Sequence, residues 1–176
     1  MIDAGVCTNR EQLLQKFDRG GVWAEVGVAS GSFSKQILDN VHPTLLVLVD
    51  AWGLVNSEPQ ADDGYKALIG VAREDHRINV IRQLSDVAAG DFADATFDVV
   101  YIDADHTRAY QDATAWWLKV KSGGYLTGHD YIDPKRWESE SFITVKRDID
   151  RFAAECGLQL TVTNEQYGSW VIHKGS

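Results

Sequence analysis

Apolar residues recur along the chain as short continuous runs, separated by segments in which they fall at three- and four-residue steps. Continuous apolar runs of this kind are typical of strands that are buried on both faces of a sheet. The expected strands cover residues 22–28, 45–50, 79–84, 97–103, 125–130, 158–163 and 169–174.

Helices are expected between these strands. Thr8–Glu11 has the spacing of a capping box, and Leu13 and Phe17 follow at helical intervals, so a first helix should end near Gly20. Residues 53–64 are polar and predict an exposed loop. The other expected helices cover 31–38, 62–74, 85–92, a segment with Tyr110, Ala113, Trp117 and Val120 on one face that stops at 122–124, and a segment from Phe142 to Cys156.

Buried strands that alternate with helices specify an α/β fold, in which a mainly parallel sheet is covered on both sides. The last two strands follow each other around a turn, so they should close the sheet as an antiparallel hairpin. No repeat or linker interrupts this order. We therefore expect a single domain over residues 1–176 with a seven-stranded, Rossmann-like sheet, and residues 1–21 as an N-terminal helical extension.

The charge and cysteine content of the chain limit the kinds of molecule that it is expected to bind. The 17 Lys and Arg residues against 26 Asp and Glu residues give a net charge of −9, which repels nucleic acid and anionic lipid. Cys7 and Cys156 are far apart and predict reduced packing residues. The N-terminus lacks the pattern of a signal peptide, and no apolar run is long enough for a membrane span. A cytoplasmic protein with a small-molecule partner is expected.

Polar residues gather where the predicted strands end. In open α/β sheets, ligands bind beyond the carboxyl ends of the strands, near the point where strand order reverses. The residues at these ends are Glu25, Gly27, Gly31, Asp50, Asp103, Asp105, His106, His129 and Asp130.

The first of these ends reads E-V-G-V-A-S-G. Gly27 and Gly31 let the chain turn tightly and let a ligand approach the backbone, although a tight turn needs such glycines without any ligand. The spacing differs from the G-x-G-x-x-G fingerprint, which disfavours a nicotinamide or flavin cofactor. Asp50, about twenty residues further on, is placed to accept hydrogen bonds from the hydroxyls of a ribose.

Together these residues resemble the class I S-adenosylmethionine-dependent methyltransferases, which carry E/D-x-G-x-x-x-G after the first strand and an acid after the second. The resemblance implies a cofactor, S-adenosyl-L-methionine, and a methyltransferase sandwich. It implies that Glu25, Gly27 and Gly31 border the methionine end, with Asp103 beside them, that Asp50 holds the ribose, and that Ser85 and Asp86 contact the adenine.

A closer resemblance is to the small metal-dependent O-methyltransferases of the catechol, caffeoyl-CoA and macrolide-sugar types, and to a bacterial group with DxDH and GHDY motifs. These carry D-A-D-K after the fourth strand and a D-N or D-D pair after a G-G. The resemblance implies that Asp103, His129 and Asp130 are metal ligands. Because His129 replaces an oxygen ligand, Mn²⁺, Fe²⁺ and Zn²⁺ remain open beside Mg²⁺.

His106 falls where relatives carry a catalytic lysine. With an ordinary pKa of about 6.5, an imidazole can remove a proton from a hydroxyl group near neutral pH. Without a metal, His106 or His129 could act directly as the base. Asp105 is expected either to orient His106 or to face solvent.

The leading hypothesis is an O-methyltransferase for a small hydroxylated molecule. Two alternatives remain open: a metal-dependent hydroxylase-like enzyme on the same fold, and a non-catalytic S-adenosylmethionine-binding module. The acceptor pocket must come from the 53–64 loop, the 131–140 loop, the N-terminal helix or a second subunit, which favours a homo-oligomer.

Overall fold

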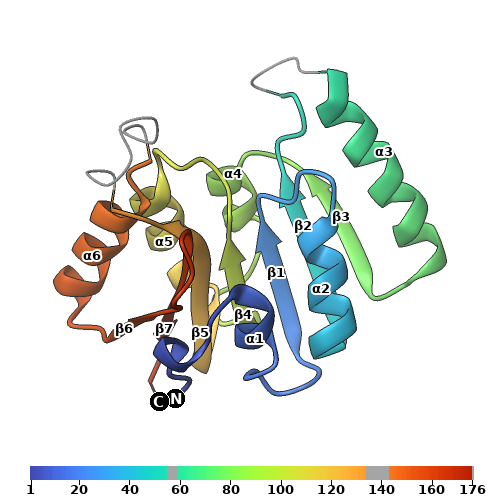
Figure 1. The fold of residues 1–176 in the computed structure, drawn as a ribbon. Helices are drawn as coiled ribbons and strands as arrows, with labels where there is room; N and C mark the ends of the chain where they lie inside the picture. Colours follow the sequence, from blue (N-terminus) through green and yellow to red (C-terminus); the bar gives the residue numbers. More distant parts are fainter. Residues whose placement is uncertain (55–58, 134–142, 176) are drawn as a thin grey trace.

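A twisted seven-stranded sheet forms the centre of the molecule (Figure 1). The computed structural model describes residues 1–54, 59–133 and 143–175, and its strand order is β3-β2-β1-β4-β5-β7-β6. The first five strands pair in parallel, and β7 runs antiparallel between β5 and β6, which confirms the predicted sheet with its closing hairpin. The strands are β1 (Val22–Val26), β2 (Leu45–Asp50), β3 (Ile78–Arg82), β4 (Phe97–Ile102), β5 (Val120–Tyr131), β6 (Leu160–Val162) and β7 (Gly168–His173).

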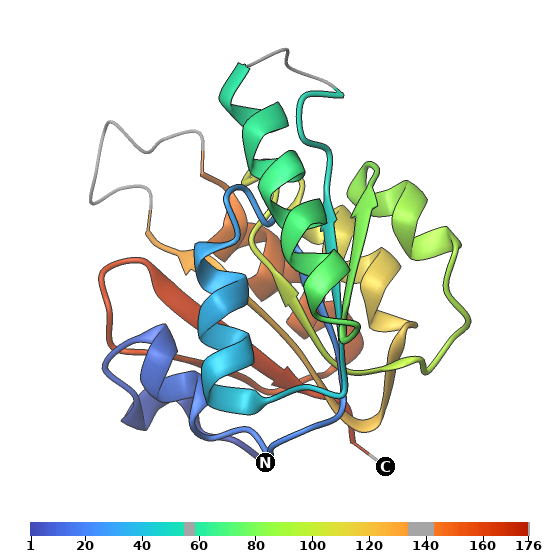
Figure 2. The same cartoon turned by 90° about the vertical axis from the view of Figure 1, so that its right-hand side faces the viewer.

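Helices cover both faces of this sheet, so the fold has three layers (Figures 1 and 2). One face carries α1 (Arg10–Leu14), α2 (Ser32–Val41) and α3 (Pro59–Glu74). The other face carries α4 (Ser85–Gly90), α5 (Ala109–Trp117) and α6 (Val145–Cys156). A short 3₁₀ helix, η1 (Ala4–Val6), precedes α1.

Each strand supplies both apolar cores, because successive side chains point to opposite faces. In β1, Trp23 packs with α1 and α2, whereas Ala24 and Val26 pack on the side of α5 and α6. In β4, Tyr101 and Ile102 divide between the two cores in the same way. This double burial explains why the strands read as continuous apolar runs.

The N-terminal helix differs from its prediction. It spans only Arg10–Leu14, and its N-cap is Asn9, whose side chain accepts a hydrogen bond from the N–H of Gln12 at 2.9 Å. The Gln12 side chain in turn accepts a hydrogen bond from the backbone N–H of Thr8. The capping interaction therefore exists, but it is shifted by one residue from the predicted capping box.

The segment around residue 120 was predicted wrongly. Helix α5 ends at Trp117, and its buried face contains Trp116 instead of Trp117. Val120 begins β5 and pairs with Phe97, after which the register shifts before the pairing of Tyr125 with Val99. The Gly pair at 123–124 therefore forms an irregularity inside a long strand, and it does not stop a helix.

The predicted loop at 53–64 is partly helical, because α3 begins at Pro59, a residue suited to the first helical position. The predicted acceptor loop at 131–140 and Phe142 lie largely or wholly outside the described residues. Within the described ranges, the structure contains no helix long and apolar enough to cross a membrane.

Strand order reverses between β1 and β4, which are neighbours in the sheet although two strands separate them in sequence. Connections from these two strands leave toward opposite faces, so their carboxyl ends open a crevice. The polar residues singled out in the sequence lie around this edge.

Candidate functional site

Gly27 brings the loop after β1 against the end of β4. Its φ is +89°, and a Cβ atom at this position would lie 2.0 Å from the carbonyl oxygen of Asp103. Gly31 has a φ of +82° and is the N-cap residue of α2, where a Cβ atom would lie 2.6 Å from Cδ2 of Leu68. Both glycines are therefore required by the backbone itself, and they also keep the crevice open to a ligand.

Asp50 fixes this glycine loop. One carboxylate oxygen, Oδ2, accepts hydrogen bonds from the N–H groups of Val28 and Ala29 at 2.7 and 2.8 Å, and Oδ1 accepts one from Trp52 at 2.8 Å. A carboxylate offers about four acceptor sites, so Asp50 can hold the loop and still accept hydrogen bonds from a ligand. The structure thus gives this residue a structural role that the sequence did not reveal.

A cavity of about 490 Å³ opens beside the loop and Asp50. This volume lies within the range of small-molecule and cofactor pockets. Of the residues predicted to contact the cofactor, Gly27, Asp50, Ser85, Asp86 and Asp103 line the cavity. Glu25 and Gly31 are not among the residues that line it.

The far end of the cavity is built by α4 and α5. The hydroxyl oxygen of Ser85 accepts a hydrogen bond from Nε1 of Trp116 at 2.9 Å, and Asp86 forms an ion pair with Arg108 at 3.0 Å. Asp112 also lines the cavity and is buried, and burial raises its pKa to about 6. Arg108 and Asp112 were missed in the sequence, where they read as ordinary polar residues of a helix.

Glu25 is 1% exposed, and its Oε2 atom has no hydrogen-bond partner among the described residues. Burial raises the pKa of this carboxyl to about 8, with a further contribution from the negative charge of Asp103, while Arg10 opposes the shift. A carboxyl group in this state is held neutral at pH 7 and lacks part of its hydrogen bonding, which is costly unless a ligand supplies it.

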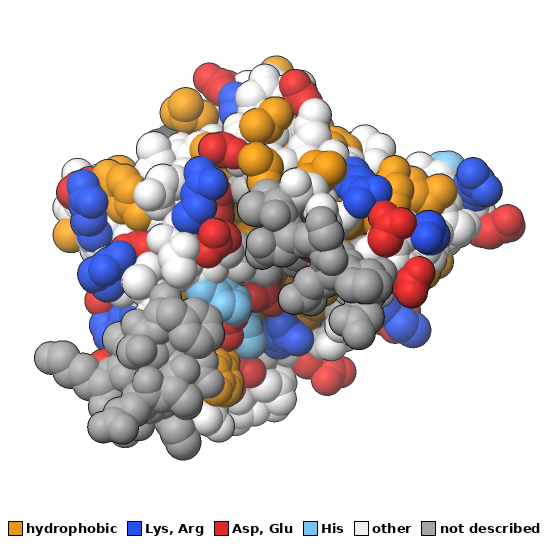
Figure 3. Space-filling view, turned by 90° about the horizontal axis from the view of Figure 1, so that it is seen from above, with side chains coloured by type: hydrophobic (Ala, Val, Ile, Leu, Met, Phe, Trp, Pro, Cys, Tyr) orange, Lys and Arg blue, Asp and Glu red, His pale blue; other side chains and the backbone are white. Residues whose placement is uncertain are grey.

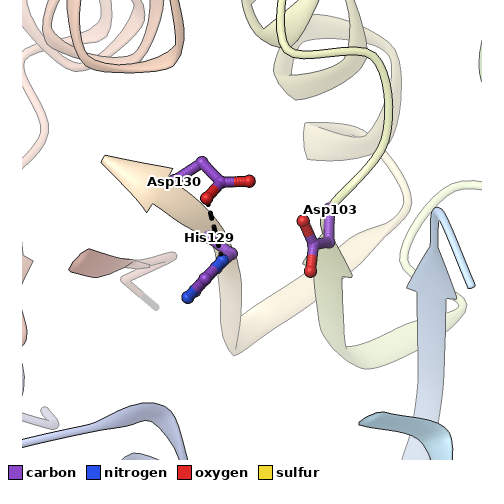
Figure 4. Close-up of side chains that lie close together, drawn as sticks. All are labelled: Asp103, His129 and Asp130. Carbon is purple, nitrogen blue, oxygen red and sulfur yellow. Dashed lines mark ion pairs between the residues drawn. The ribbon is translucent and has the colours of Figure 1, made fainter. Parts of the chain in front are cut away.

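Asp103, His129 and Asp130 form the one group of potential metal ligands found among the described residues (Figure 4). One ligand atom from each lies within 4.8 Å of the others. Asp103 follows β4, and the other two residues end β5, so neighbouring parallel strands bring them together. Two carboxylates and one imidazole suit a divalent metal of intermediate softness, and the residues therefore fit the ion that the sequence implied.

His106 joins this group through Asp130. Its Nε2 atom lies 2.8 Å from Oδ2 of Asp130, and Nδ1 of His129 lies 3.1 Å from Oδ1. The hydrogen bond to Asp130 raises the pKa of His106 against the opposing effect of burial. Burial also disfavours the charge on Asp130, but the two histidine hydrogen bonds outweigh it and hold the pKa of Asp130 below its usual range.

The backbone at Asp130 is unusual. Its φ is +56°, in the left-handed region that non-glycine residues rarely enter, and the pairing register between β5 and β7 shifts between Gly128 and Tyr131. Such a conformation costs on the order of 1–3 kcal/mol and tends to occur at functional sites. Here it turns the Asp130 carboxylate toward His106.

Asp105 has a local role. Its side chain accepts hydrogen bonds from the N–H and the hydroxyl of Thr107 at 2.9 and 2.7 Å, and its carbonyl accepts one from the N–H of Arg108. Asp105 therefore shapes the turn that leads into α5. The structure gives no hydrogen bond between this carboxylate and His106 among the described residues.

Seen from the carboxyl ends of the strands, histidine side chains lie at the surface beside acidic and basic side chains (Figure 3). One basic residue of this site was not predicted from the sequence. Arg10, at the start of α1, lies with Nη1 3.3 Å from Oδ2 of Asp103. Nothing in its sequence context signals this contact, because 93 residues separate the two side chains.

Comparison with known protein families matches residues 24–131 to the methyltransferase domain family. The matched region runs from β1 to the end of β5 and contains the cavity, the glycine loop and the Asp103, His129 and Asp130 cluster. A comparison with curated proteins finds no match.

Several solved structures share the fold. An O-methyltransferase from Bacillus cereus in complex with SAH has a TM-score of 0.68 and 16% identity, covering 98% of this chain and 83% of its own. Cofactor-bound Rv0187 from MTB has a TM-score of 0.71 and 15% identity, covering 97% and 81%. Aeropyrum pernix fibrillarin with bound S-adenosyl-L-methionine has a TM-score of 0.65 and 17% identity, covering 93% and 73%. At such identities the likeness establishes the fold, and the acceptor must be argued from the site.

Proposed function

Since this chain belongs to the methyltransferase domain family, we propose that it is an S-adenosylmethionine-dependent O-methyltransferase that acts on a small hydroxylated molecule. The observation that carries the proposal is that Asp103 belongs to two sites. This residue lines the large cavity and also belongs to the cluster with His129 and Asp130. A cofactor site and a proton-handling site therefore meet at one carboxylate.

The cavity supports binding of the adenosine part of the cofactor. Asp50 lies at the end of β2, where it can accept hydrogen bonds from ribose hydroxyls while it holds the glycine loop. Ser85 and Asp112 lie at the opposite end and offer polar groups to the adenine. The bound cofactor supplies an electrophilic methyl group on its sulfonium.

His106 is the proposed base for the acceptor hydroxyl. Its Nε2–H donates to Asp130, which orients the ring and leaves Nδ1 free of that bond to receive a proton. The base must be neutral before the reaction, so the raised pKa of His106 sets the lower pH limit of activity. His129 also contacts Asp130 and is the alternative base of the site.

Asp103, His129 and Asp130 would hold a divalent metal, Mg²⁺, Mn²⁺ or Fe²⁺. When bound, such an ion would lower the pKa of an acceptor hydroxyl group and help to position it. In this arrangement Asp130 serves both the ligand set and His106, because its two oxygens face different partners.

Binding and turnover test the proposal. Isothermal titration with S-adenosylhomocysteine should show one site in the wild-type protein, weakened at least tenfold by Asp50→Asn and unchanged by Asp39→Asn, a matched change at an exposed carboxylate of α2. Turnover is followed as S-adenosylhomocysteine released in the presence of a panel of catechols, hydroxy acids and sugars. Absence of S-adenosylhomocysteine binding to folded protein would refute the proposed cofactor.

The metal is tested separately. Mn²⁺ titration should give one site that is lost in Asp103→Asn and kept in Asp105→Asn, since Asp105 lies nearby but outside the cluster. Methyl transfer that persists at full rate after chelation would remove the metal from the proposal and leave His106 as an unassisted base. Cofactor binding without transfer to any acceptor would instead favour a binding module.

A further inference from the structure

Arg10 lies outside residues 24–131, which match the family, but its guanidinium group lies at the end of β4. Nη1 lies 3.3 Å from Oδ2 of Asp103, and the centre of the guanidinium lies 4.6 Å above the ring of Phe33. The Arg10 side chain is 28% exposed to solvent. The contact with Phe33 and the ion pair with Asp103 together hold the guanidinium at the end of β4.

The position beside Phe33 is the first turn of α2. Gly31 is the N-cap residue and, having no side chain, makes no capping hydrogen bond to the N–H groups of this turn. Such groups favour a negative charge. Arg10, which contacts Phe33 in this turn, and the start of this ten-residue helix therefore both favour an anion in this part of the site.

Carboxyl groups lie next to this positive region. Glu25 is buried, and its Oε2 atom has no hydrogen-bond partner among the described residues. The charges of Asp103 and Arg10 both act on this carboxyl group. A ligand group that donates a hydrogen bond to Oε2 would complete the bonding of Glu25 and favour its ionised form. Arg10 can therefore bind an anionic group of a ligand. Glu25 and Asp103, beside it, can accept hydrogen bonds from a donor group of the same ligand.

This pairing matches the α-amino acid end of the proposed cofactor. Resting on the function proposed above, we propose that Arg10 binds the α-carboxylate of the methionine moiety, with Glu25 and Asp103 beside its ammonium group. Arg10 would then select the carboxylated cofactor over a decarboxylated one. The selecting residue comes from the N-terminal extension, and the matched domain supplies the adenosine pocket.

An ion pair that served only to neutralise Asp103 would not explain how Arg10 contacts this carboxylate. A guanidinium that only pairs with a carboxylate commonly uses two donors at about 2.7–2.9 Å. The contact between Arg10 and Asp103 uses Nη1 alone at 3.3 Å. Arg10 also acts on the hydroxyl of Tyr101. A planar group with five donors can serve both partners and still offer donors to a second carboxylate.

Three ligands that differ only at the amino acid end test the inference by isothermal titration. They are S-adenosylhomocysteine, its decarboxylated analogue S-adenosyl-3-thiopropylamine, and 5′-methylthioadenosine. The wild-type protein should prefer S-adenosylhomocysteine over the decarboxylated analogue by roughly 10²-fold, the usual scale of a charge-assisted carboxylate contact. Arg10→Met should remove most of that preference and leave the affinity for 5′-methylthioadenosine unchanged.

Arg10→Lys keeps the charge without the planar fork and should retain part of the preference. Arg19→Met, at an exposed arginine of the same N-terminal segment, is the matched control and should leave the preference intact. Thermal unfolding of each variant verifies that the fold is kept.

The outcomes separate the two proposals. If the folded wild-type protein binds none of the three ligands, the proposed function fails and the inference fails with it. If the wild-type protein prefers S-adenosylhomocysteine but Arg10→Met and Arg10→Lys keep the full preference, only the role of Arg10 is overturned. An equal loss of affinity for all three ligands would also overturn it, since that result describes a purely structural arginine.

Discussion

Asp130 and His106 are joined across the ends of two parallel strands, with Oδ2 of Asp130 2.8 Å from Nε2 of His106. The pairing occurs where Asp130 has a left-handed backbone conformation, at a φ of +56°. It fixes which nitrogen of His106 carries the proton in the neutral ring, because the nitrogen facing the carboxylate must donate.

Replacing Asp130 by Asn should lower the pKa of His106. The hydrogen bond to the carboxylate is the largest cause of the raised pKa, and burial acts in the opposite direction. Once the charge is removed, burial favours the neutral ring, so the pKa should fall below its wild-type value. An NMR titration of the His106 imidazole measures this directly, with His106→Gln to assign the signal and Asp39→Asn as an exposed control. An unchanged or higher pKa in Asp130→Asn would contradict the pairing.

Changing His106 to Gln should reduce methyl transfer by about 10²–10⁴-fold, the scale of a lost general base, and should leave the Kd of S-adenosylhomocysteine nearly unchanged. His106→Lys should recover activity at high pH. A lysine, with an ordinary pKa of about 10.4, is neutral only at higher pH, so the rate should rise about tenfold per pH unit well beyond the wild-type limit. His76→Lys, at an exposed position, should retain the wild-type pH profile. A His106→Lys profile with the wild-type limit would exclude His106 as the base.

Gly27→Ala should destabilise the protein strongly. The new methyl group would lie 2.0 Å from the backbone carbonyl of Asp103, which cannot move away as a flexible side chain could, and the positive φ adds strain. We expect a loss of several kcal/mol, on the order of overpacked core substitutions or more. The matched control is Gly70→Ala in α3, where a Cβ meets no atom of the described residues within 4 Å; it should stabilise the protein by about 0.5–1 kcal/mol. Urea unfolding of both variants measures the difference, and similar free energies of unfolding would show that the loop can relax.

Much of the site followed from the sequence because it is built at strand ends. The apolar runs located β2, β4 and β5, and parallel pairing then brings residues such as Asp50, Asp103 and Asp130 to one edge of the sheet. Long-range neighbours could be expected here because a single topological rule relates them.

The contacts that were missed depend on side-chain packing between elements that no periodic pattern relates. Arg10 reaches Asp103 only because α1 packs against α2 and Phe33 supports the guanidinium. Asp112 lines the cavity and lies one turn before Trp116 on the buried face of α5, whereas the apolar pattern had placed Trp117 on that face. The start of β5 at Val120 was not predicted, because Gly123 and Gly124 indicated the end of a helix. In the structure they lie within the strand, where the pairing register shifts.

Glu25 should make the stability of the folded protein fall as pH rises. Its pKa is raised from an ordinary 4.5 to about 8, chiefly by burial. Between these two values the folded state holds a proton that the unfolded state releases, so the folded state binds more protons. The free energy of unfolding therefore decreases with pH, by up to about 1.4 kcal/mol per pH unit from this one group. The loss begins above pH 4.5 and is complete once the pH passes about 8.

Glu25→Gln isolates this contribution, because glutamine keeps the shape of the protonated acid and cannot ionise. Urea unfolding from pH 5 to 9 should give a variant that gains stability relative to the wild-type protein as pH rises. Glu74→Gln, at an exposed position of α3, should show no such growing difference. The comparison uses differences between proteins at each pH, so other titrating groups such as Asp112 cancel. A Glu25→Gln difference that stays constant from pH 5 to 9 would mean that Glu25 is ionised in the folded protein throughout, and that the Arg10 charge outweighs its burial.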